Sequence, residues 1–217
     1  MAYRSDRAVI GRRLTVPDSF EFILQSFSDD RGSVTPLFNQ ERFTELVSHS
    51  FRVAQVNHNI SRRGTVRGIH FTETPPGQAK YVFCLSGSLL DVVVDVREGS
   101  PTFGQWDAVT LTAHRPSAVY LAEGLGHACM ALEEDTSMAY LCSTEYNPGI
   151  DHAINPVDVG LAISWPTMPI ALSDKDAAAP TLAEASEQRI LPRYSDCLSH
   201  YRKKVSTTAP KEGALSS

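Results

Sequence analysis

The sequence predicts one all-β domain, an antiparallel barrel or sandwich with short helices at its periphery. Strand-like apolar runs recur about every ten residues between residues 81 and 143, and Gly and Pro separate them. Helical periodicity is confined to two short segments nearer the ends of the chain. With 217 residues, 42% of them hydrophobic, the chain is long enough to bury one sizeable core.

The elements follow in order along the chain. The first expected helix covers residues 39–48, where Phe43, Leu46 and Val47 share one helical face. Two apolar runs, 81–85 and 89–96, flank a Ser-Gly-Ser turn and predict a β-hairpin. Further strands are expected at 108–111, 118–121, 128–132 and 138–143.

The C-terminal region contains the second expected helix, residues 181–190. Thr181 and Glu184 are spaced as in a capping box at its start. The small polar segment 206–217 is expected to be a disordered tail. Residues 1–205 are therefore expected to form a single domain.

Charge and cysteine content exclude several classes of protein. The net charge of −5 argues against a nucleic-acid surface, and no apolar run is long enough to span a membrane. The N-terminus has no apolar signal region, and the four cysteines include no C-x-x-C pair. We therefore expect a soluble cytoplasmic protein without a disulfide scaffold or a zinc finger.

The stretch from residue 55 to residue 80 contains several candidate functional side chains, among them Arg67, His70 and Lys80. Strict alternation predicts that His70 and Gly68 face one way, while Arg67 and its neighbours face the other. Lys80 is expected on a face with apolar side chains, and so is Tyr140. Ionisable groups among apolar neighbours on barrel strands indicate a lumen in which burial tunes their pKa values.

Nine short motifs occur in order between about residue 15 and residue 195 and together carry a family resemblance. They are residues 30–32 (DRG), 55–57 (QVN), 67–71 (RGIHF), 76–80 (PGQAK), 99–104 (GSPTFG), 140–143 (YLCS), 145–148 (EYNP), 163–166 (ISWP) and 172–176 (LSDKD). With them the sequence closely resembles the dTDP-4-dehydrorhamnose 3,5-epimerase family, cupin-like enzymes that act on dTDP-4-keto-6-deoxy sugars.

The resemblance implies a cupin-like jelly roll or antiparallel β-barrel and a homodimer that exchanges N-terminal strands. It also implies inversion of C3, C5 or both carbons beside the C4 ketone. Such a reaction needs a base on one face, an acid on the other, and a cation or donors at the ketone oxygen. No redox cofactor and no metal are expected.

The resemblance also assigns roles to individual residues. His70 resembles the base, and Asp176 the carboxylate that orients it and stabilises the imidazolium. Tyr140 resembles the acid on the opposite face, and Lys80 the group that stabilises the enolate. Substrate-binding roles are expected for Arg31, Gln55, Asn57, Arg67, His127 and Tyr146. Arg62 and Arg63 are interpreted as a solvated turn.

A metal-binding cupin is the less favoured interpretation. Such proteins carry His-x-His with a nearby Glu, whereas Gly68 stands two residues before His70. Two other functions stay open on the same scaffold. One is a sugar-nucleotide ketoisomerase that moves the carbonyl between C3 and C4, and the other is a non-catalytic module that binds a nucleotide sugar.

The chain departs from the family pattern at two places. An aromatic residue and a Glu are usual where Ser33 and Thr35 stand, and Gly-Phe is usual where Ala128 and Cys129 stand. These differences leave open which carbon is inverted. They favour an enzyme of deoxysugar biosynthesis for a natural product over the housekeeping rhamnose enzyme.

Overall fold

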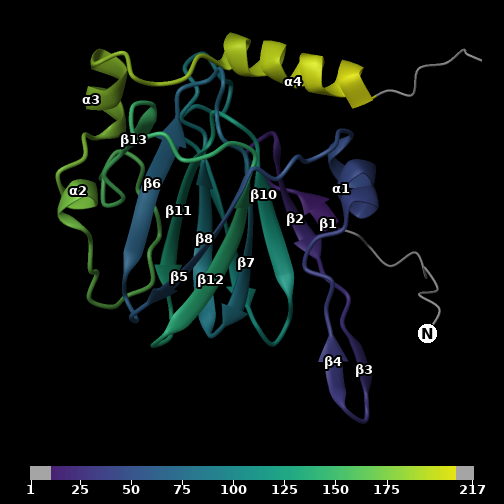
Figure 1. The fold of residues 1–217 in the computed structure, drawn as a ribbon. Helices are drawn as coiled ribbons and strands as arrows, with labels where there is room; N and C mark the ends of the chain where they lie inside the picture. Colours follow the sequence, from purple (N-terminus) through teal and green to yellow (C-terminus); the bar gives the residue numbers. More distant parts are fainter. Residues whose placement is uncertain (1–10, 209–217) are drawn as a thin grey trace, which may run out of the picture.

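Two antiparallel sheets face each other and enclose the core (Figure 1). The computed structural model describes residues 11–208. The first sheet has six strands in the order β1 (Gly11–Arg13), β2 (Ser19–Ile23), β10 (Ser117–Leu121), β7 (Lys80–Ser86), β12 (Thr136–Cys142) and β5 (Gln55–Ser61). The second has five, in the order β13 (Asp151–Ala153), β6 (Val66–Thr72), β11 (Gly126–Ala131), β8 (Ser88–Val94) and β9 (Trp106–Thr112). The predicted all-β class is confirmed.

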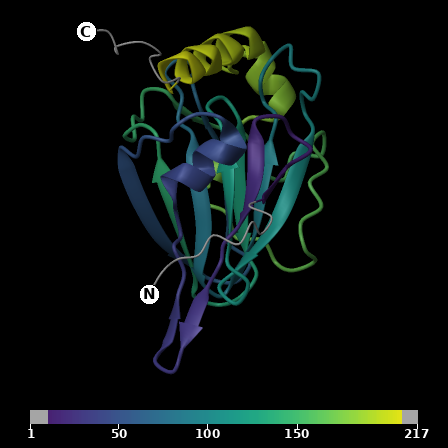
Figure 2. The ribbon, with the colours of Figure 1, turned by 90° about the vertical axis from the view of Figure 1, so that its right-hand side faces the viewer.

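The smaller elements lie around this pair of sheets. A two-stranded hairpin, β3 (Phe27–Asp29) and β4 (Gly32–Val34), projects away from the barrel (Figure 2). The helices are α1 (Gln40–Val47), α2 (Asp174–Ala177), α3 (Leu182–Glu187) and α4 (Tyr194–Thr208). None of the helices within residues 11–208 is long and apolar enough to cross a membrane.

Both helices expected from the sequence are present. Asn39 caps α1 by accepting a hydrogen bond from the backbone N–H of Arg42, and Phe43 is its buried residue. Thr181 and Glu184 form the capping box at the start of α3. Helix α4 was not predicted, and the expected tail boundary at residue 206 falls inside it. Residues 209–217 lie outside the described part, so the tail stays a prediction.

Apolar side chains pack in three layers. Val82, Leu89, Val93 and Leu121 belong to the layer between the sheets. An aromatic layer on the outer face of the six-stranded sheet includes Phe43 of α1 and residues 20, 22, 51, 81, 83 and 120. A third layer lies on the outer face of the five-stranded sheet, against the segment 154–191. Several strands are therefore buried on both faces, which explains their nearly continuous apolar runs.

The predicted hairpin over 81–96 is wrong. Strand β7 pairs with β10 and β12, whereas β8 pairs with β9 and β11 in the other sheet. The chain passes between the sheets at Gly87, whose φ is 73°. A short Gly-containing turn between apolar runs suits a hairpin and a crossover equally well, and the available neighbouring strands decide between them.

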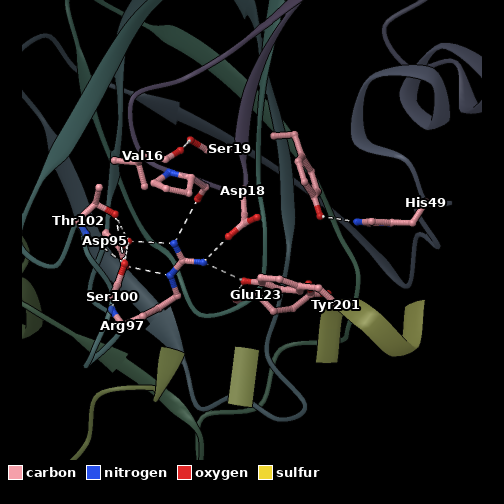
Figure 3. A network of polar contacts seen from close by, with 12 residues as sticks. Val16, Asp18, Ser19, His49, Asp95, Arg97, Ser100, Thr102, Glu123 and Tyr201 are labelled. Atoms are coloured by element: carbon pink, nitrogen blue, oxygen red, sulfur yellow. Dashed lines mark hydrogen bonds and ion pairs between the residues drawn. The ribbon is translucent and has the colours of Figure 1, made fainter. Parts of the chain in front are cut away.

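A buried ion-pair network joins three distant segments at one end of the barrel (Figure 3). The guanidinium of Arg97, with 0% of its side chain exposed, donates to Asp95 at 2.9 Å and to Asp18 at 2.7 Å. It also lies 4.9 Å from the ring centre of Tyr194 at the start of α4. The network therefore links the turn between β1 and β2, the loop after β8, and the C-terminal helix.

Replacing Arg97 by Met is expected to lower the free energy of unfolding by about 3–5 kcal/mol, because Asp95 is left buried without its counter-ion. Denaturant titration measures the change. Arg12→Met serves as the matched control, since Arg12 pairs with Glu21 at an exposed site. Loss of that pair is expected to lower the free energy of unfolding by less than about 1 kcal/mol. Equal losses in the two variants would contradict this account.

Candidate active site

A cavity of about 750 Å³ opens between the two sheets. Strands β5, β12 and β7 of the six-stranded sheet form one wall, and β6, β11 and β13 of the other sheet form the second. The segment 171–176 lies along it. Its lining holds all four predicted catalytic residues and all but one of the predicted substrate-binding residues: His70, Lys80, Tyr140, Asp176, Gln55, Asn57, Arg67, His127 and Tyr146.

Strand register places the polar residues of the first wall side by side. Tyr140 pairs with Asn57 on β5, and Cys142 lies opposite Lys80 on β7. Tyr140 packs against the apolar layer between the sheets, and Lys80 is 9% exposed. The predicted inward orientation of both side chains is confirmed.

The second wall contains two histidines directly opposite each other, His70 on β6 and His127 on β11. Cys129 is opposite Arg67, so one residue of β11, Ala128, lies opposite two residues of β6, which is a β-bulge. Gly68 lies within the bulge at a φ of 101°, and an added Cβ would be 2.3 Å from the carbonyl oxygen of His127. The alternation prediction for Arg67 is therefore wrong, because the extra residue turns Arg67 into the cavity with His70.

His70 forms a hydrogen bond with the carboxylate that the resemblance assigned to it. Its Nε2 lies 2.7 Å from Oδ1 of Asp176. Ser173 caps α2 by accepting from the backbone N–H of Asp176, which holds this carboxylate in place. Burial raises the pKa of Asp176, but His70 and Ser173 outweigh it and the net pKa is lowered. The ionised carboxylate favours the tautomer with a proton on Nε2 and leaves Nδ1 with a lone pair.

A second histidine–carboxylate pair was not predicted. Nε2 of His127 lies 2.8 Å from Oδ2 of Asp91, whose side chain is completely buried. Asp91 is an acidic residue among the valines and leucines of β8, and that contrast is the signal that would have identified it. The pair fixes the orientation of His127 at the cavity wall.

Lys80 and Tyr140 have pKa values shifted by burial. Burial lowers the pKa of the Lys80 ammonium, although Cys142, Asp151 and Asp91 oppose this shift. Burial raises the pKa of the Tyr140 phenol, with Arg67 and Asn57 acting in the other direction. The phenol is thus protonated at neutral pH and has a proton to donate.

Arg31 is the predicted site residue that the structure keeps away from the cavity. It lies at the turn of the β3–β4 hairpin, where its side chain is 88% exposed and pairs with Asp29 at 2.6 Å. Three of the other predicted substrate-binding residues lie together. Gln55 donates to Asn57 at 2.7 Å and accepts from the backbone N–H of Tyr146.

Several cavity residues were missed or misread in the sequence. Arg62 lines the cavity, whereas only Arg63 turns away, toward Glu134 and the carbonyl of Leu132. Both arginines are exposed, as the interpretation as a solvated turn expects, but Arg62 also borders the cavity. Lys175, paired with Asp151 at 3.1 Å, also reaches the cavity.

Cys129 contributes a small side chain to the cavity wall. Burial raises the pKa of its thiol to about 12. The thiol is therefore protonated at neutral pH. Across residues 11–208, no three His, Cys, Asp or Glu side chains gather as ligands for one metal ion. The expectation of a metal-free reaction stays a prediction.

Comparison with known proteins gives one consistent answer. A family profile described as dTDP-4-dehydrorhamnose 3,5-epimerase matches residues 13–184. An enzyme of that name from Mycolicibacterium smegmatis is 46% identical over 187 residues, 86% of this chain and 92% of the relative. A dTDP-4-dehydro-6-deoxyglucose 3-epimerase from Streptomyces bikiniensis is 52% identical over 168 residues, 77% of this chain and 86% of the relative.

A solved structure adds the spatial comparison. ChmJ, a 3'-monoepimerase from Streptomyces bikiniensis in complex with dTDP-quinovose, matches with a TM-score of 0.87 and 45% identity. The match covers 89% of this chain and 98% of that one. From its sequence, its fold and its cavity, the chain belongs to the dTDP-4-dehydrorhamnose 3,5-epimerase family of isomerases.

Proposed function

We propose that this protein epimerises a dTDP-4-keto-6-deoxyhexose beside its C4 ketone. The observation that carries the proposal is the placement of an oriented base and a protonated phenol on opposite walls of one cavity. His70 comes from the five-stranded sheet and Tyr140 from the six-stranded sheet. A sugar ring between them has one face toward each group, which inversion of a carbon requires.

Proton removal is the task of His70. Its Nδ1 takes the proton from the carbon next to the ketone, and the electrons of that C–H bond move toward the carbonyl oxygen. The Asp176 carboxylate, 2.7 Å from Nε2, stabilises the imidazolium that forms. Without this partner, the ring is free to rotate and to change its tautomer.

Enolate stabilisation is the task of Lys80, because its ammonium lies in a largely buried site where charge acts strongly. His127, oriented by Asp91, offers a further polar group from the opposite wall. Tyr140 then donates its phenolic proton to the face of the carbon away from His70. The carbon is inverted, and both residues exchange protons with solvent before the next turnover.

The nucleotide diphosphate is expected near the polar residues of the same cavity. Arg67 and Arg62 are suited to phosphate oxygens, and Gln55 and Asn57 supply neutral donors. Tyr146 is 57% exposed, as expected for a ring that stacks on thymine or flanks the sugar.

The inverted carbon is C3, C5 or both. The relatives include one enzyme named a 3,5-epimerase and another named a 3-epimerase. The changes at Ser33, Thr35, Ala128 and Cys129 favour a deoxysugar pathway that serves a natural product. We place the reaction in the cytoplasm.

We further propose a homodimer in which each hairpin completes the partner's site. Every residue of β3 and β4 except the half-buried Phe27 is exposed, and a two-stranded hairpin alone is marginally stable in water. Val34 on this hairpin is 61% exposed, and Val56 and Ile60 on the outer face of β5 are 61% and 58% exposed. A second copy that covers these side chains would also supply Arg31 to the diphosphate.

Incubation of the 4-keto sugar nucleotide with the protein in deuterated water is expected to introduce deuterium at C3, at C5 or at both, as read by NMR. His70→Asn is expected to reduce the exchange at least about 100-fold, because the amide cannot act as a base. His114→Asn, at an exposed position outside the cavity, serves as the matched control.

Three outcomes of that experiment would contradict the proposal in different ways. A carbonyl moved to C3 would indicate the ketoisomerase. If the wild-type protein introduces no deuterium, the non-catalytic module that binds a nucleotide sugar is the candidate function that remains. Normal exchange in His70→Asn would refute the role of His70 as the base.

Tyr140→Phe is expected to separate the two proton transfers. Epimerisation should fall about 100-fold or more, whereas exchange at the reacting carbon should fall less than about tenfold, because deprotonation does not need the acid. Parallel measurement of product configuration and deuterium content tests this. Equal losses of epimerisation and of exchange would contradict the assignment of Tyr140 as the acid. No loss of either rate would indicate that Tyr140 has only a structural role.

Mixing of two inactive variants tests the exchanged hairpin. If Arg31 serves the partner's site, an Arg31→Ala chain and a His70→Asn chain can together form one intact site. Unfolding and refolding of an equal mixture should restore about a quarter of wild-type activity, since half of the dimers are mixed and each has one intact site. A mixture no more active than its components would contradict the proposal.

A further inference from the structure

Glu123 lies outside the cavity, yet its buried carboxylate connects the C-terminal helix to the strand that holds Lys80. Its side chain is 2% exposed. Oε1 accepts a hydrogen bond from Ser143 Oγ at 3.1 Å and forms an ion pair with Lys204 of α4. Burial raises the pKa of this carboxyl, but His200 and Lys204 lower it to about 2 overall. Glu123 is therefore ionised at neutral pH.

Ser143 makes the connection to Lys80. Its Oγ accepts from the backbone N–H of Ala79 at 2.8 Å, and its own backbone N–H donates to the carbonyl of Ala79 at 3.0 Å. Ala79 immediately precedes Lys80, and Ser143 follows Cys142, the residue opposite Lys80. The hydroxyl of Ser143 thus joins the Glu123 carboxylate to the backbone on which Lys80 is built.

The bend before Lys80 packs directly on Glu123. A Cβ added to Gly77, whose φ is 69°, would be 2.5 Å from the Cβ of Glu123, so the backbone of the bend closely approaches this side chain. On its other side the bend is held by Thr144, which donates to the carbonyl of Gly77 at 3.0 Å. Gln78, another cavity residue, donates to the carbonyl of Thr144. The bend therefore has few alternative positions.

Helix α4 holds Glu123 from the opposite side. Besides the Lys204 ion pair, the phenol of Tyr201 donates to the backbone carbonyl of Glu123. A Cβ added to Gly124 would be 2.5 Å from the Sγ of Cys197, which shows how closely α4 packs on this loop. The same Tyr201 hydroxyl accepts from Arg97 of the buried network (Figure 3).

We propose that Glu123 is a positioning residue, which transmits the docking of α4 through Ser143 to the backbone of Lys80 and so sets where the ammonium stands in the cavity. The inference rests on the proposed role of Lys80 at the enolate oxygen. A small displacement of that ammonium weakens an interaction made chiefly in the transition state, so kcat should fall while KM hardly changes.

Ser143→Ala removes the connecting hydroxyl without touching the cavity. We expect kcat to fall about tenfold with KM within about twofold of wild type, and deuterium exchange to fall in proportion, because enolisation is the step that Lys80 assists. Ser143→Thr keeps the hydroxyl and should restore kcat to within about twofold. Melting temperature and folded fraction are measured in parallel, so that kcat refers to folded protein.

Lys204→Met tests the α4 end of the connection, and its melting temperature and folded fraction are measured as well, because the buried Glu123 carboxylate loses its ion pair. We expect kcat about threefold lower at unchanged KM, whereas the matched Arg202→Met, at an exposed position of the same helix, should behave as wild type.

Three results would overturn the inference while the proposed function stood. They are wild-type kcat in Ser143→Ala, an equally low kcat in Ser143→Thr, and identical kcat in Lys204→Met and Arg202→Met. Absence of exchange in the wild-type protein would instead contradict the proposed function itself.

Discussion

The hydrogen bond between His70 and Asp176 is the interaction on which the site depends. It joins a strand of the barrel to a helix 106 residues later and brings the segment 171–176 to the cavity. A nearly buried carboxylate needs a partner of this kind, since leaving it unpaired would be costly. The same bond that ties the C-terminal segment to the barrel also orients the imidazole, as the proposed proton transfer requires.

Two facing sheets can hold side chains on opposite sides of one bound sugar ring, as the proposed inversion requires. Each wall is anchored by its own strand pairs, so His70 and Tyr140, the proposed base and acid, are held by different sheets of the fold. The second histidine pair, His127 with Asp91, follows the same rule of a carboxylate behind an imidazole. Burial shifts two of these groups, since it raises the pKa of the Tyr140 phenol and lowers the pKa of the Lys80 ammonium.

Charged groups outside the cavity serve the architecture. Arg97 and Asp95 are buried together at one end of the barrel, and Glu123 with Lys204 extends this polar region toward the bend that precedes Lys80. Polar networks of this type specify one arrangement of the chain because each member left unpaired would be costly. Helix α4, which the sequence did not predict, supports the site in the positioning role proposed for Glu123.

The sequence by itself determined the all-β class, the two short helices, the capping box of the second helix and the resemblance to the family, because short motifs and local periodicity are properties of neighbouring residues. Nine of the ten residues that the resemblance singled out line the cavity. Only the tertiary structure decided the rest. The 81–96 segment crosses between sheets because its partners are distant strands, and Arg67 joins His70 because one extra residue shifts the register at Gly68. Asp91 pairs with His127 behind the cavity wall, Arg62 borders the cavity, and Arg31 lies away from it. These positions depend on segments that are far apart in the chain.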